Sequence, residues 1–118
     1  MRVIVAGAVA WGDAEAIRRE LIHLPSGTTV VHGDSPGADA LAGKIAAELG
    51  FVVEPMAKNE HDYAKYKRGA WKSLNERMLA SKVDLVLVFH PDINASRGSK
   101  HLVELASAAS IQVHVFTE

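Results

Sequence analysis

The fold of this chain is decided by residues 28–49, TTVVHGDSPGADALAGKIAAEL. The β-branched residues 29–31 predict a short buried strand, which residues 32–34 end. Ser35 and Pro36 then predict the start of a helix, because a serine hydroxyl can cap free amides and the fixed φ of proline suits the first turn. Apolar residues recur beyond them at three- and four-residue spacing, so this helix buries one face.

The turn between this strand and this helix is a candidate anion site. At Gly37, several free backbone N–H groups and the positive end of the helix dipole would point at one place. We expect either a bound phosphate or a purely structural turn. If a phosphate binds, Gly37→Val is expected to abolish binding and leave the fold intact, because the new side chain would crowd the anion. Gly50 is expected to end the helix in a left-handed conformation.

The composition is that of one globular domain spanning residues 1–118, with 48% hydrophobic and 23% charged residues. The net charge of -1 gives no support to a general nucleic-acid or membrane-surface role. There is no cysteine, which excludes disulfides and thiolate chemistry. The apolar stretch 3–11 is short for the core of a signal peptide, and no segment approaches the length of a membrane span, so we expect a cytoplasmic protein.

Strand-like and helix-like segments alternate along the whole chain. Strands are predicted at 3–6, 29–31, 51–54, 84–89 and 112–116, and helices at 14–24, 36–49, 71–78 and 98–109. This alternation predicts an α/β fold, a single Rossmann-like three-layer domain with a mostly parallel five-stranded sheet. The polar stretch 56–70 interrupts the pattern. We interpret it as a solvated, partly helical excursion, with a functional lid as the alternative.

Ligands of such sheets bind beyond the carboxyl ends of the strands, where the strand order reverses. That rule selects three segments, each with glycine and small polar residues: 7–13, 32–39 and 90–99. In these segments, His32 and His90 contact phosphate, act as acid and base, or orient loops through backbone hydrogen bonds. Arg97 is a candidate phosphate clamp, and Trp11 either stacks on a base or packs in the core. The histidines show no metal-ligand spacing, so we expect neither a metal nor a cofactor.

The sequence HGDSPGADALA at 32–42 resembles the HG(G/D)xxGADxLA signature of the YspA/YpsA-related branch of the SLOG superfamily. RVIVAG at 2–7, Asn75 with Met78, and SRGS at 96–99 are similar to three further elements of that family. The resemblance spans nearly the whole chain. It implies a Rossmann-like sheet that binds a nucleotide or nucleotide-derived ligand, and it suggests a homodimer.

The resemblance also assigns site residues. It implies that Gly33, Gly37 and Asp39 shape a central phosphate or ribose site, and that Gly98 and Ser99 form a second anion-binding helix start. Together with the strand-end residues, the predicted ligand-binding set is Gly7, Trp11, His32, Gly33, Asp34, Gly37, Asp39, Asn75, His90, Arg97, Gly98 and Ser99.

The chain also departs from the family pattern. Residues 8–10 read Ala-Val-Ala where the family shows Gly-Arg-Asp, and Leu74 replaces an arginine. Leu102 occupies the position of the glutamate found in hydrolytic LOG enzymes. Because cleavage of an N-glycosidic bond requires a carboxylate, the missing glutamate favours binding over catalysis.

Three functions therefore stay open, of which the first is preferred. The chain binds a nucleotide as a sensor or sequestering protein, it is a nucleotide phosphoribohydrolase in which Asp34 or Asp39 substitutes for the glutamate, or it is an interaction module. In the last case the segment 58–72 would dock DNA or an acidic protein, although nucleic acid is not the partner we expect.

Overall fold

Five parallel strands form the central sheet of the computed structural model, which describes residues 1–118. They lie in the order β3-β2-β1-β4-β5 and comprise β1 (Arg2–Gly7), β2 (Thr29–Gly33), β3 (Val52–Met56), β4 (Leu85–Phe89) and β5 (Gln112–Phe116). Every neighbouring pair is parallel, so the sheet is all-parallel where the sequence predicted a mostly parallel one. The strand order reverses between β1 and β4, and a crevice is expected at that point.

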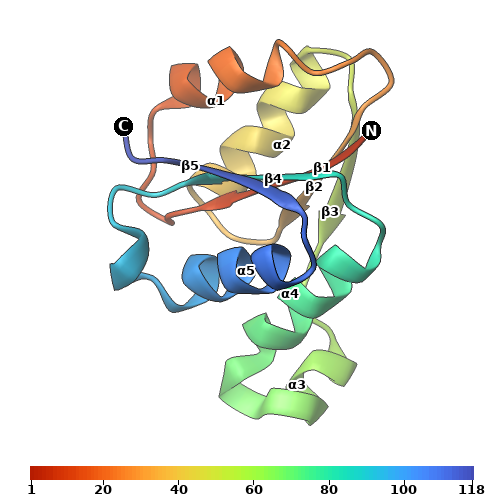
Figure 1. Ribbon diagram of the computed structural model, residues 1–118, viewed down its shortest axis with the longest axis vertical. Helices are drawn as coiled ribbons and strands as arrows, with labels where there is room; N and C mark the ends of the chain where they lie inside the picture. Colours follow the sequence, from red (N-terminus) through yellow and green to blue (C-terminus); the bar gives the residue numbers. More distant parts are fainter.

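Helices cover both faces of the sheet and make three layers (Figure 1). One face carries α1 (Ala14–Leu21) and α2 (Ala38–Glu48), and the other carries α4 (Ala70–Ala80) and α5 (Arg97–Ala108). The α/β, Rossmann-like fold class is thereby confirmed. The short η2 (Ile93–Ala95) precedes α5. No helix has the length and apolar character that crossing a bilayer requires.

The segment that interrupts the alternation is helical. It forms α3 (Glu60–Tyr66) and the 3-10 turn η1 (Lys67–Gly69), which lie beyond α4 and away from the sheet in Figure 1. An asparagine, Asn59, caps α3 through a reciprocal pair of hydrogen bonds with Asp62. The prediction of a partly helical excursion is confirmed.

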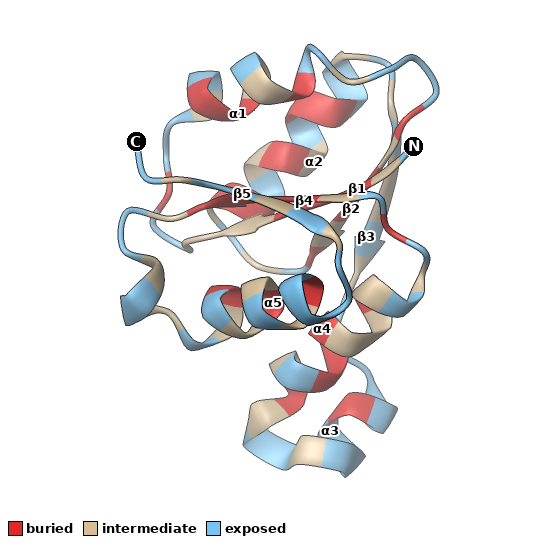
Figure 2. Ribbon diagram, viewed as in Figure 1, coloured by how far each residue is buried: buried red, intermediate tan, exposed pale blue.

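The hydrophobic core lies in two layers, one on each side of the sheet (Figure 2). Successive side chains of a strand point to opposite faces, so Val3 and Val5 of β1 pack toward α1 and α2. Ile4, between them, packs toward α4 and α5. All three are fully buried, which explains why β1 and β4 read as continuous apolar runs in the sequence.

Several predicted element boundaries are wrong, and the first helix ends at Leu21 and not at residue 24. The second helix begins at Ala38, with Gly37 at the N-cap and no side-chain cap, so Ser35 does not cap it and Pro36 lies outside it. The third strand does not end at Pro55 but continues to Met56. Since β3 is an edge strand, the missing N–H of proline costs no hydrogen bond within the sheet.

The left-handed conformation predicted at the end of the second helix is confirmed. Gly50 has a φ of 83° directly after that helix. A residue with a Cβ would be strained there, so glycine suits the stop.

Candidate ligand-binding cleft

A cleft of about 560 Å³ opens at the carboxyl edge of the sheet, where β1, β2 and β4 end. Its walls are the β1–α1 loop, the β2–α2 turn, one side of α4 and the connection from β4 to α5. Small-molecule sites usually measure about 300–1,000 Å³. The cleft therefore has room for a ligand of nucleotide size.

Most of the residues predicted to bind a ligand line this cleft, because the carboxyl ends of parallel strands meet at this edge of the sheet. Those that line it are Gly7, Gly33, Asp34, Asp39, Asn75, His90, Arg97, Gly98 and Ser99. Trp11, His32 and Gly37 do not line it, because each is engaged elsewhere in the fold.

Trp11 and His32 make structural contacts. The Trp11 ring is buried edge-on against Phe89, with centroids 5.7 Å apart, and its Nε1–H donates to the Asp13 carbonyl. The Nδ1–H of His32 donates to the Gly33 carbonyl at 2.8 Å, and its ring lies against Gly43 of α2. Trp11 therefore packs in the core, and His32 hydrogen-bonds to the backbone of its own loop.

Gly37 packs closely against the β1–α1 loop. A Cβ added to it would lie 2.4 Å from the carbonyl oxygen of Ala8 and 2.2 Å from that of Val9. The first amide of the helix, that of Ala38, already donates to the Ala8 carbonyl at 3.1 Å. Carbonyl oxygens repel an anion, so this geometry disfavours the predicted phosphate contact at Gly37.

What the β2–α2 turn offers the cleft is instead a carboxylate. Asp39 is 7% exposed, lines the cleft, and its Oδ1 has no hydrogen-bond partner. Burial raises the pKa of Asp39 to about 7, a rise that the Ser35 N–H opposes and the negative charge of Asp34 reinforces. Gly33 makes room for this group, because a Cβ there would lie 2.8 Å from Asp39 Oδ2.

The start of α5 offers the opposite charge. The Ser96 hydroxyl caps the helix by accepting from the Ser99 N–H at 3.1 Å, whereas the N–H groups of Arg97 and Gly98 donate to no protein acceptor. Both residues line the cleft. Free amides, the positive end of the helix dipole and the Arg97 guanidinium make this end of the cleft suitable for an anion.

Asn75 and His90 line the cleft and also hold its walls together. The Asn75 Nδ2 group donates to the Gly98 carbonyl and to His101 Nδ1, both at 3.1 Å, and so joins α4 to the start of α5. His90 Nδ1 accepts from the Asp92 N–H at 3.0 Å, which fixes the orientation of its ring.

Sequence reasoning missed Lys58, Trp71 and Ser96, all of which line the cleft. Lys58 follows the carboxyl end of β3, so the rule that selected the other strand ends would have found it. Trp71 precedes Asn75 by four residues and therefore lies on the same face of α4. Ser96 lies three residues before Ser99, which is the spacing of a helix cap.

The comparisons with known proteins agree with this geometry. The solved structure of DNA processing protein A (DprA) from Streptococcus pneumoniae is similar, with a TM-score of 0.74 at 16% identity. The match covers 97% of this chain and 49% of that one, so this chain spans about half the length of DprA. The Gene 61 protein of Mycobacterium phage D29 is 31% identical over 119 residues, which cover 95% of this chain and 93% of that protein.

The family model that matches describes the YspA, cpYpsA-related SLOG family. It aligns with residues 1–63, which contain the strand, the turn and the helix of the HGDSPGAD stretch as well as β1. The chain belongs to this SLOG family.

Proposed function

We propose that this chain is a single nucleotide-binding domain, spanning residues 1–118, that holds a nucleotide or nucleotide-derived ligand in the cleft as a sensor or sequestering protein. The observation that carries the proposal is the unpartnered Oδ1 of the buried Asp39 at the cleft wall. Buried polar atoms are nearly always hydrogen-bonded, and leaving one without a partner costs about 1–3 kcal/mol. Because the protein itself covers Oδ1, a ligand hydroxyl or N–H group supplies the missing donor when the Asp39 carboxylate turns toward the cleft.

The charges in the cleft support a ligand with a hydrogen-bond donor at one end and an anionic group at the other. A sugar hydroxyl or a base N–H donates to Asp39, and an anionic group binds the open amides and the guanidinium at the start of α5. A nucleotide carries both kinds of group. SLOG family membership supports the same class of ligand.

The direct test is calorimetric titration with mono-, di- and cyclic nucleotides and with ADP-ribose. We expect saturable binding of at least one of them at one site per chain. If none of these compounds releases or absorbs heat, and none raises the melting temperature, the proposal is wrong.

Gly98→Val is the substitution that tests the anion end of the cleft. A Cβ at Gly98 meets no atom within 4 Å, so the fold tolerates a larger side chain there. In the cleft the new methyl groups compete with the ligand anion, and we expect nucleotide affinity to fall at least about tenfold, which is about 1.4 kcal/mol. The melting temperature should stay at the wild-type value. Unchanged affinity would mean that the anion does not bind at α5.

A second candidate function, nucleotide phosphoribohydrolase, is favoured by the pKa of Asp39. A carboxyl group that titrates at about 7 is suited to general acid–base catalysis at neutral pH. Against this function, α5 brings no carboxylate to the position of the family glutamate, because Leu102 lines the cleft there.

Incubation with AMP separates the two functions. Release of adenine and ribose 5-phosphate, abolished by Asp39→Asn, would establish the enzyme. Binding of AMP without release of adenine supports the sensor. A cytoplasmic location and a homodimer stay predictions, which cell fractionation and sedimentation would test.

A further inference from the structure

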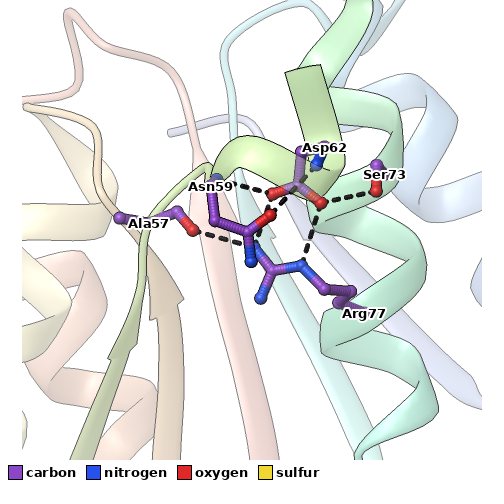
Figure 3. Close-up of polar contacts among 5 residues, drawn as sticks. All are labelled: Ala57, Asn59, Asp62, Ser73 and Arg77. Carbon is purple, nitrogen blue, oxygen red and sulfur yellow. Dashed lines mark hydrogen bonds and ion pairs between the residues drawn. The ribbon is translucent and has the colours of Figure 1, made fainter. Parts of the chain in front are cut away.

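Lys58 lines the cleft. Its two neighbours in the sequence, Ala57 and Asn59, are both held by the hydrogen bonds that Figure 3 shows. The Ala57 carbonyl accepts from Arg77 Nη2 at 2.8 Å. The Asn59 N–H donates to Asp62 Oδ2 at 2.9 Å, and Asn59 Oδ1 accepts from the Asp62 N–H at 3.0 Å. The backbone that carries Lys58 is therefore fixed on each side.

Both sets of contacts depend on one ion pair. Asp62 is fully buried and receives hydrogen bonds from Arg77 Nε at 2.9 Å and Nη2 at 2.6 Å, and also from the Ser73 hydroxyl. The Arg77 hydrogen bond is the main cause that holds the pKa of Asp62 well below its usual range. Asp62 stays ionised at neutral pH, so the clamp that Asp62 and Arg77 form is intact under ordinary conditions.

The Asp62–Arg77 clamp lies outside the cleft, and Lys58 lies in its wall. Neither Asp62 nor Arg77 lines the cleft, but Lys58 does. Lys65, in the same segment, is paired with Glu76 at 2.9 Å, whereas no carboxylate lies within ion-pair distance of Lys58. The Lys58 ammonium is thus a free cation on a fixed backbone, beside a cleft whose α5 end already suits an anion.

We propose that Lys58 binds the anionic group of the cleft ligand, and that the clamp of Asp62 and Arg77 is the device that positions Lys58. This inference rests on the proposed function and narrows the ligand class. Cationic side chains reach the cleft from two separate segments, through Lys58 and Arg97. The preferred ligand is therefore a phosphorylated nucleotide and not a nucleoside or a free base.

The experiment is calorimetric titration of ADP, AMP and adenosine into the wild-type chain and three lysine variants. Lys58→Ala is expected to weaken ADP and AMP binding about tenfold and to leave adenosine binding unchanged. Lys58→Arg is expected to retain most of the affinity. Lys44→Ala is the control, because Lys44 is exposed on α2 and does not line the cleft.

The outcomes separate this inference from the proposed function. If Lys58→Ala binds ADP as tightly as the wild-type chain does, the inference is overturned and the proposed function stands. The inference also fails if adenosine and ADP lose affinity equally. Absence of binding of all three compounds to the wild-type chain contradicts the proposed function, and the inference with it.

A double-mutant cycle tests the positioning role. Arg77→Lys keeps a positive charge near Asp62 but cannot hold both the carboxylate and the Ala57 carbonyl. We expect it to weaken ADP binding by about threefold in the wild-type background and to have no further effect in the Lys58→Ala background. An equal loss in both backgrounds would show that Arg77 acts independently of Lys58, which would overturn the positioning role.

Discussion

Asp39→Asn is expected to stabilise the protein at pH 8 and to remove most of the pH dependence of its stability between about pH 4 and 7. In the folded chain burial raises the pKa of Asp39 from 3.8 to about 7. Between those values the folded state binds a proton that the unfolded state has released, so stability falls as the pH rises. Above pH 7 the folded chain carries the full cost of a buried, ionised carboxylate.

The expected size follows from the pKa values. Each pKa unit corresponds to about 1.4 kcal/mol, and the rise from 3.8 to about 7 therefore corresponds to about 4 kcal/mol. We expect urea unfolding at pH 8 to show a gain of about 2–4 kcal/mol for Asp39→Asn, since the asparagine amide has its own cost of burial. Glu104→Gln is the control, because Glu104 is an exposed carboxylate on α5 that does not line the cleft. A pH profile of Asp39→Asn parallel to that of the wild-type chain would contradict this account.

The same substitution should weaken ligand binding. A hydrogen bond to an ionised acceptor contributes about 1 kcal/mol more than one to a neutral acceptor, so at pH 8, above the Asp39 pKa of about 7, Asp39→Asn is expected to lower nucleotide affinity roughly fivefold to tenfold. Stability and affinity then change in opposite directions in a single variant. That opposition is typical of a group retained for function and not for folding.

Gly37→Ala is expected to prevent stable folding at 25 °C, with a loss of more than about 4 kcal/mol. The backbone at Gly37 has φ 78° and ψ -128°, a conformation that is essentially limited to glycine. An added Cβ would also lie 2.2 Å from the Val9 carbonyl oxygen, which belongs to a backbone that cannot move without displacing the β1–α1 loop. Gly37→Val should unfold the chain for the same reason.

Gly50→Ala is the matched control for this prediction. Gly50 has a similar φ of 83°, but a Cβ there meets no atom within 4 Å. Its substitution carries only the cost of the left-handed backbone, about 1–2 kcal/mol. Circular dichroism and urea unfolding compare the two variants. Gly50→Ala introduces backbone strain alone, whereas Gly37→Ala adds a steric clash between the new Cβ and the β1–α1 loop. If both variants lose the same stability, the close contact between Gly37 and the β1–α1 loop does not matter.

Much of the fold was predictable because local signals and tertiary structure agree. β1 and β4 are buried on both faces and therefore read as continuous apolar runs. The start of α2 was not predictable in this way. Ser35 and Pro36 are good local starting residues, but the loop at Ala8 and Val9 packs against Gly37 and shifts the helix start to Ala38. A contact between segments far apart in the sequence outweighed the local preference.

In the candidate site, too, the general location was predictable and the contacts of individual side chains were not. The cleft could be located because ligands of parallel sheets bind beyond the carboxyl ends of the strands, which depends only on the topology of the sheet. That topology did not determine which side chains face the ligand. Trp11 and His32 have the chemistry of binding residues, yet both are engaged by Phe89, Asp13, Gly33 and Gly43 within the fold. That Asp39 Oδ1 has no hydrogen-bond partner could be established only from the structure, because it depends on which groups surround that oxygen.

The most direct measurement is the crystal structure of this chain soaked with ADP. We expect ADP to occupy the cleft, with a hydroxyl or N–H group within hydrogen-bond distance of Asp39 Oδ1 and a phosphate against the amides of Arg97 and Gly98. ADP bound outside the cleft, or inside it with Asp39 Oδ1 still unpartnered, would contradict the account.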